Sequence, residues 1–124
     1  MPIIVAVDHE QHQVNVVAIG PITRDDAVQQ LVHQARGGAL SYPAFVDVRG
    51  AGVLITPEEN REVAEKFREY ARRTPLGPMA FVVSSDAAAE TIGVLVQLVG
   101  DAVPLRVFRV EQEARDWLRA QSTR

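Results

Sequence analysis

The sequence alternates short runs of apolar, mostly β-branched residues with segments whose apolar residues recur at helical spacing. No other feature limits the fold as strongly. The apolar runs predict strands at residues 3–7, 14–19, 44–48, 79–83 and 105–108. Only the short polar stretch 8–13 separates the first two, which predicts a β-hairpin. Each later run follows a segment long enough for a right-handed crossover helix, which predicts a mainly parallel sheet.

Four helices are predicted between and after these strands. They run from Thr23 to Gly37, from Thr56 to Thr74, from Ser84 to about Val99 and from Glu111 to about Ala120. The strongest local signal is Thr56-Pro-Glu-Glu59, with threonine as N-cap, proline at the first helical position and glutamate three residues after the cap. Residues 49–52, Arg-Gly-Ala-Gly, are predicted as a turn. The prediction is one α/β domain over residues 1–124, with element order ββαβαβαβα and helices on both faces of a mixed sheet.

Composition excludes several classes of protein. The chain has 124 residues, with 13 Lys and Arg against 16 Asp and Glu, for a formal charge of −3. This balance argues against a nucleic-acid-binding surface. There is no cysteine, which excludes disulfides, thiol catalysis and thiolate metal sites. No apolar run approaches the roughly 18 residues of a membrane span. We expect a cytoplasmic protein with no cofactor.

Two stretches of the sequence resemble one known family. The ending Phe108-Arg-Val-Glu-Gln-Glu-Ala114, followed by Trp117-Leu118, is similar to the closing motif of SpoIIAA-like (STAS-related) domains. Ala44-Phe-Val-Asp-Val48, with the glycine turn and the Thr-Pro-Glu start after it, looks like the middle of that family. The resemblance covers nearly the whole chain and agrees with the element order predicted above.

The resemblance implies a binding module. STAS domains mostly bind other molecules, and some are anti-sigma-factor antagonists switched by phosphorylation of a serine that follows an aspartate. Ile55-Thr56-Pro57 stands at that place in this chain, so the Asp-Ser pair is absent and Thr56 supplies the hydroxyl. SpoIIAA-like proteins are also similar in shape to CRAL-TRIO lipid carriers, which implies a small lipophilic ligand as an alternative.

Polar residues lie at the carboxyl ends of the predicted strands 44–48 and 79–83 or soon after them. Ligands bind at this edge of the sheet in many α/β folds. These residues are Thr56, Asp47, Arg49, Ser84 and Ser85. A phosphate on Thr56 would lie at a helix N-terminus, although capping alone accounts for this residue. Asp47 and Arg49 are favoured as a structural ion pair, and the two serines as a helix cap. Gly50 and Gly52 do not have the spacing of a dinucleotide-binding loop.

The hairpin connection carries Asp8, His9 and His12, which could bind a metal only weakly because a turn does not hold ligands in place. A solvated turn is the favoured interpretation. Elsewhere we find no set of nucleophile, base and orienting group. An enzyme is therefore the least expected function.

The third helix is unusually apolar. Residues 91–100 contain no charge, and apolar side chains surround the helix rather than forming one stripe. Either its own chain covers it on several sides, or it contacts a partner or ligand. The residues of this candidate contact are Ile92, Gly93, Val94, Val96 and Val99.

The sequence therefore predicts a non-enzymatic binding module, with a homodimer through the third helix as the leading hypothesis. One alternative is a carrier that holds a lipophilic ligand between this helix and the sheet, near Phe45, Phe81 and Tyr42. Another is partner exchange controlled by phosphorylation of Thr56. Nothing in the sequence identifies the partner.

Overall fold

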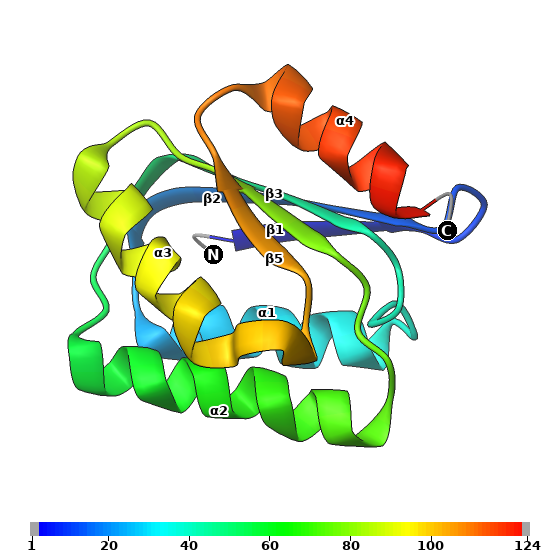
Figure 1. Cartoon of the computed structure of the whole chain (residues 1–124), viewed down its shortest axis with the longest axis horizontal. Helices are drawn as coiled ribbons and strands as arrows, with labels where there is room; N and C mark the ends of the chain where they lie inside the picture. The colour runs from blue at the N-terminus through cyan, green and yellow to red at the C-terminus, as the bar shows by residue number, and fades with distance from the viewer. Residues whose placement is uncertain (1–2, 123–124) are drawn as a thin grey trace.

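The computed structural model describes residues 3–122 and contains the predicted elements in the predicted order (Figure 1). The strands are β1 (Ile3–Asp8), β2 (Gln13–Ile22), β3 (Ala44–Val53), β4 (Met79–Val82) and β5 (Leu105–Phe108). The helices are α1 (Arg24–Arg36), α2 (Pro57–Arg73), α3 (Asp86–Val99) and α4 (Glu111–Ser122), with a short 3-10 turn at Gly100–Ala102. No helix in this part of the chain is both long and apolar enough to cross a membrane.

The five strands form one sheet in the order β1-β2-β3-β4-β5. β1 pairs antiparallel with β2, and the other neighbours are parallel, which confirms the mixed sheet. Because the strands are added in sequence toward one edge, right-handed crossovers must place α1, α2 and α3 on the same face. α4 follows the last strand and lies on the opposite face, as Figure 1 shows. Helices thus cover both faces, but unequally.

Two cores of different size result from this arrangement. The larger lies between the sheet and α1–α3, where Val46, Val63 and Phe81 are almost fully buried. The smaller lies under α4 and consists of Phe45, Ala80, Val82, Ala114 and Leu118, with Phe108 and Trp117 packed against it.

β3 is longer than the sequence predicted. The expected turn at Arg49–Gly52 is part of the strand, since Gly50 pairs with Ile19 and Gly52 with Pro21. The register shifts between Val17 and Ile19, where β3 contains one residue more than β2. The glycines therefore serve a β-bulge and not a chain reversal.

The helix starts agree with the sequence. Thr23 and Thr56 each form a capping box with the acid three residues later, Asp26 and Glu59. The Ser85 side chain accepts a hydrogen bond from the backbone N–H of Ala88 and caps α3.

One glycine allows two chain segments to approach closely. Gly77 lies in the connection between α2 and β4, and its N–H donates to the Leu40 carbonyl at 2.9 Å. A Cβ at this position would come far inside van der Waals distance of the Ser41 and Tyr42 carbonyl oxygens. By contrast, a Cβ on Gly52 would meet no atom within 4 Å.

We therefore expect Gly77→Ala to lower the free energy of unfolding by about 2 kcal/mol, because two backbone segments must separate. The matched variant Gly52→Ala should leave it unchanged or raise it by up to about 1 kcal/mol. Urea unfolding of both variants measures the difference. Equal stability of the two variants would contradict the close approach.

Candidate functional site

Asp47 and Arg49 lie within β3, because this strand is longer than predicted, and Asp47 pairs with Val82 at the end of β4. Ser84 and Ser85 follow β4, and Thr56 follows β3. Ser84 and Arg49 meet directly, since the Ser84 hydroxyl donates to the Arg49 carbonyl at 2.9 Å. The connections that leave β3 and β4 both lead to the α1–α3 face, however. A ligand crevice of the usual α/β kind requires neighbouring connections that diverge to opposite faces. The topology does not provide such a crevice between β3 and β4.

Asp47 and Arg49 form a two-point ion pair. Arg49 Nε donates to Asp47 Oδ1 at 3.0 Å, and a terminal guanidinium nitrogen donates to Oδ2 at 2.9 Å. Asp47 Oδ1 also accepts from the Arg49 backbone N–H at 3.0 Å. The carboxylate therefore satisfies backbone at the bulge and neutralises the arginine beside it. This is the structural ion pair that the sequence favoured.

The ion pair continues into α4. The Arg49 guanidinium also donates to Glu111 at 2.9 Å, and Glu111 accepts from Arg115 Nε at 2.9 Å. The Arg115 guanidinium carbon lies 4.0 Å from the centre of the Phe45 ring. We call Asp47, Arg49, Glu111 and Arg115 the rim network; it ties the first turn of α4 to β3.

Electrostatics in the rim network stabilise the charged forms of its members. Arg49 holds the pKa of Asp47 below its ordinary value, while partial burial opposes this shift. Arg115 and then Arg49 lower the pKa of Glu111, and Asp47 and then Glu111 raise that of Arg49. A carboxylate whose pKa is lowered is a poor proton acceptor near neutral pH. The rim network therefore does not favour general acid–base chemistry.

The hydroxyl groups near the rim are engaged in structural hydrogen bonds. Ser84 donates to a backbone carbonyl, Ser85 caps α3, and Thr56 accepts from the Glu59 N–H at 3.2 Å. None of these bonds joins a hydroxyl to a side chain that could remove its proton.

α3 is covered mainly by its own chain. Ile92 and Val99 belong to the larger core, and Val96 packs against it, so these three residues are wholly or partly used inside the monomer. Val94 is 39% exposed, and a Cβ on Gly93 would meet no atom within 4 Å. A contact through α3 can therefore use Val94 and Gly93, with only the exposed part of Val96, and not Ile92 or Val99.

The structure corrects the predicted lipid-binding region. Phe45 lies in the core under α4, whereas Phe81 lies in the core on the opposite face, so the two rings cannot line one cavity. The reason is that Phe45 is directly paired with Ala80, and Phe81 comes one residue later and points the other way. Tyr42 packs against the core that contains Phe81, and it also lines a polar hollow of about 950 Å3 with His12 and Arg115.

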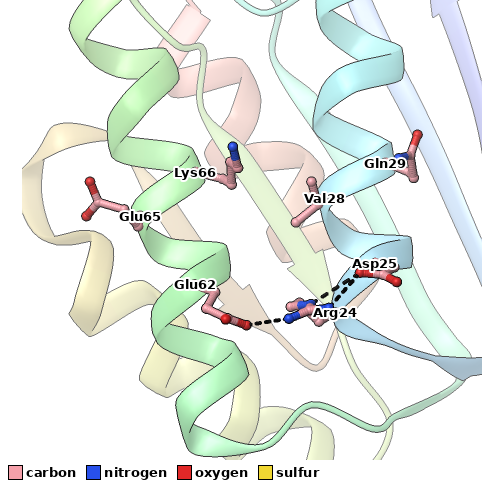
Figure 2. Close-up of a pocket in the computed structure, with 7 residues that line it drawn as sticks. All are labelled: Arg24, Asp25, Val28, Gln29, Glu62, Glu65 and Lys66. Carbon is pink, nitrogen blue, oxygen red and sulfur yellow. Dashed lines mark hydrogen bonds and ion pairs between the residues drawn. The ribbon is translucent and has the colours of Figure 1, made fainter.

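A second hollow of about 440 Å3 lies between α1 and α2, away from the predicted region (Figure 2). Arg24 bridges its mouth and pairs with Asp25 at 3.1 Å and with Glu62 at 2.8 Å. Figure 2 shows charged side chains around it and Val28 as its apolar contribution. Apolar atoms nevertheless make up most of its exposed lining, but it is not the region between α3 and the sheet that the sequence predicted.

The hairpin histidines contact an aromatic ring. His9 Nδ1 lies 2.7 Å from the Tyr42 hydroxyl, and the His12 ring stacks on Tyr42 with centroids 5.1 Å apart. Over residues 3–122, no three His, Cys, Asp or Glu side chains are grouped closely enough to hold a metal ion.

One surface was missed by the sequence reasoning. Ile4, Val17 and Ile19 are 59%, 40% and 59% exposed on the α4 side of β1 and β2, and we call them the outer patch. Ile4 and Val17 are paired across the two strands, so their side chains lie next to each other. A signal for the outer patch was present in the sequence, because β1 carries apolar residues on both faces. Only one helix follows the last strand and can cover the second face.

Comparison with solved structures identifies the fold. An uncharacterised protein of the DUF3478 family from Shewanella loihica PV-4, described as having a SpoIIAA-like fold, matches with a TM-score of 0.60 and 16% identity. The match covers 94% of this chain and 93% of that chain. The chain has a SpoIIAA-like fold. The anti-sigma factor antagonist SpoIIAA, in its unphosphorylated form, matches with a TM-score of 0.57 and 15% identity over 94% of this chain and 97% of its own.

Sequence comparisons add no closer assignment, since no family model and no curated protein matches the chain. The SpoIIAA-like fold confirms the resemblance recognised in the sequence. At this level of identity it establishes the fold and not a shared activity.

The rim network predicts a specific dependence of stability on pH. Because the pKa of Asp47 is lowered by folding, its charge stabilises the native state above the ordinary value of 3.8, and this contribution is lost as pH falls through the lowered pKa. Asp47→Asn keeps an acceptor for the Arg49 N–H but removes the charge. We expect wild type to be more stable than this variant at neutral pH and the difference to disappear in acid. Unfolding curves at several pH values measure it, with Asp101→Asn as a control for net charge.

The capping box at α2 predicts a second effect. Thr56→Ala removes the acceptor for the Glu59 N–H and should cost about 1 kcal/mol in the free energy of unfolding. Thr56→Ser keeps the hydroxyl and should cost much less. Thermal unfolding of both variants tests the cap, and equal losses would show that the methyl group matters instead.

Proposed function

We propose that this SpoIIAA-like chain is a non-enzymatic binding module that recognises another protein through the outer patch. The observation that carries the proposal is the uncovered half of the sheet, where three large aliphatic side chains are 40–59% exposed on adjacent strands. Grouped aliphatic side chains on a protein surface commonly mark a contact with another protein.

The surroundings of the outer patch suit a protein partner. The rim network borders the patch, because Asp47 pairs with Val17 across β2 and β3. An aliphatic centre with charged groups at its margin is the usual composition of a protein–protein contact.

The non-enzymatic part of the proposal rests on how the polar groups are used. Asp47, Arg49, Glu111 and Arg115 neutralise one another, and Ser84 and Ser85 bond to backbone. A catalytic site needs groups that are free to act on a substrate.

The homodimer through α3 remains a prediction with less support than the outer patch. Its exposed aliphatic residue is Val94, because the neighbouring apolar side chains pack into their own chain. The carrier hypothesis has less support still, since Phe45 and Phe81 lie on opposite faces.

Thr56 supports a second candidate, a phosphorylation-controlled change of partner. Its side chain is exposed at the start of α2, beside Glu58 and Glu59. A phosphate there would add nearly two negative charges next to two acids. Thr56→Glu should then change the affinity for the protein partner, and an unchanged affinity would exclude this form of control.

Two matched variants test the outer patch against α3. Ile19→Lys places a charge in the outer patch, and Val94→Lys places one on α3, on the opposite side of the sheet. Each variant and the wild type would be immobilised and used to capture proteins from an extract of the source cells. A partner so identified would then be purified and its affinity measured by calorimetry.

We expect Ile19→Lys to weaken partner binding by at least about tenfold, because a charge must be desolvated at the centre of the contact. Val94→Lys should bind as wild type does. Loss of binding in Val94→Lys alone would show that the partner binds at α3. Equal binding by all three proteins would show that the partner binds at neither surface.

A further inference from the structure

The two edges of the sheet differ in how they are protected from other strands. β5 has four residues, follows Pro104 directly and carries the exposed Arg106. Shortness, proline and charge are all features that keep edge strands from pairing. β1 has six residues, and its first five, Ile3–Val7, are all apolar. Its register with β2 is uninterrupted from Ile3 to Asp8, so no bulge bends it away.

β1 also has unpaired backbone groups. In the described part of the chain its neighbour is β2 on one side, and no strand adjoins the other. Alternate residues of such an edge direct their N–H and C=O groups outward, where they can bond to another strand. The side chains of Ile3, Val5 and Val7 pack against the larger core on the α1 side of the sheet. They are only half-buried, because the free edge of β1 leaves them open on their other side.

We propose that β1 pairs antiparallel with β1 of a second copy of this chain. The pairing would join two five-stranded sheets into one of ten strands. A two-fold axis normal to the sheet relates the two copies, so each face of one sheet continues into the same face of the other.

The residue pattern of β1 explains why the partner is a second copy. Residues directly opposite in an antiparallel pair point to the same face, so the pairing must match odd positions with odd and even with even. When the two-fold axis passes between the two Val5 residues, Ile3 lies opposite Val7 and Ile4 opposite Ala6 of the second copy. Every pair within Ile3–Val7 is then apolar, and no charge meets a like charge. Centred on Ala6, the pairing would instead place Ile4 opposite Asp8.

This inference goes beyond the proposed function and does not depend on it. Edge pairing uses the backbone of β1, whereas the outer patch uses side chains on one face. The two are continuous, because Ile4 belongs to both. A dimer through β1 would bring the two outer patches together into one larger surface.

The absence of cysteine from the chain allows a direct test. Val5→Cys places a thiol at the centre of the proposed pairing, where opposite Cα atoms are about 5 Å apart, within disulfide range. Val107→Cys is the matched control, since Val107 is also a half-buried valine on an edge strand, packed against the same core. Each variant is oxidised mildly and analysed on a denaturing gel without reductant.

We expect Val5→Cys to form a covalent dimer and Val107→Cys to remain mostly monomeric. Equal cross-linking of the two variants, or none in Val5→Cys, would overturn the proposal. Sedimentation of the wild-type protein measures its oligomeric state without any substitution. It should show a species of twice 13.6 kDa at high concentration, and a monomer throughout would also overturn it.

A lysine on the edge provides the complementary test. Ala6→Lys places a charge among the apolar residues of β1 at an exposed position, and it should raise the dimer dissociation constant at least about tenfold. Ala87→Lys, at an exposed position on α3, is the control and should leave the constant unchanged. Dissociation caused by Ala87→Lys but not by Ala6→Lys would place the dimer contact on α3 and refute the edge pairing. If Ile19→Lys abolishes partner binding while Val5→Cys still cross-links, the two surfaces act independently.

Discussion

Coverage of the sheet is the constraint on which the rest of the molecule depends. Sequential strands joined by right-handed crossovers place α1, α2 and α3 on one face and leave α4 as the helix that covers the other. A helix is about 10 Å wide, and neighbouring strands are about 4.8 Å apart, so one helix covers about two to three strands. α4 covers β3, β4 and β5, and β1 and β2 remain open on that side.

The rim network follows from the same arrangement. α4 has a small core of its own, and the ion pairs from Arg49 to Glu111 and from Glu111 to Arg115 add an attachment at its first turn. Such partly exposed pairs are individually weak, but here they share members and surround an arginine stacked on Phe45. Two of the polar residues that resembled a functional site in the sequence, Asp47 and Arg49, thus help to hold α4 in place. The proposed interaction surface is the part of the sheet that α4 does not cover.

The features that sequence predicted well are those set by neighbouring residues. Thr56-Pro57 and Glu59 form a capping box because its donors and acceptors lie within one helical turn. The alternation of strands and helices likewise gave the mixed sheet. Gly50 and Gly52 were misassigned because the same residues suit a turn or a bulge, and pairing with β2 decided between them. The local sequence pattern does not show which residues of β2 pair with Gly50 and Gly52.

The exposed surfaces were harder to predict because they depend on strand order. The apolar excess of α3 is explained by packing against the sheet and α2, which no local pattern reveals. Phe45 and Phe81 were expected together, yet the pairing of Phe45 with Ala80 sends the two rings to opposite faces. The exposure of Ile4, Val17 and Ile19 became evident only when α1, α2 and α3 were all found on the other face.

We have proposed that the uncovered half of the sheet, rather than the carboxyl ends of its strands, is where this SpoIIAA-like chain meets another protein chain. Amide hydrogen exchange of the wild-type protein at low and at high concentration tests it most directly. If β1 pairs with a second copy, exchange in β1 should slow as concentration rises, while exchange in β5 and in the first turns of α2 and α3 should not change. Exchange in β1 that is independent of concentration, together with slowing at α3 or at the strand ends, would contradict it.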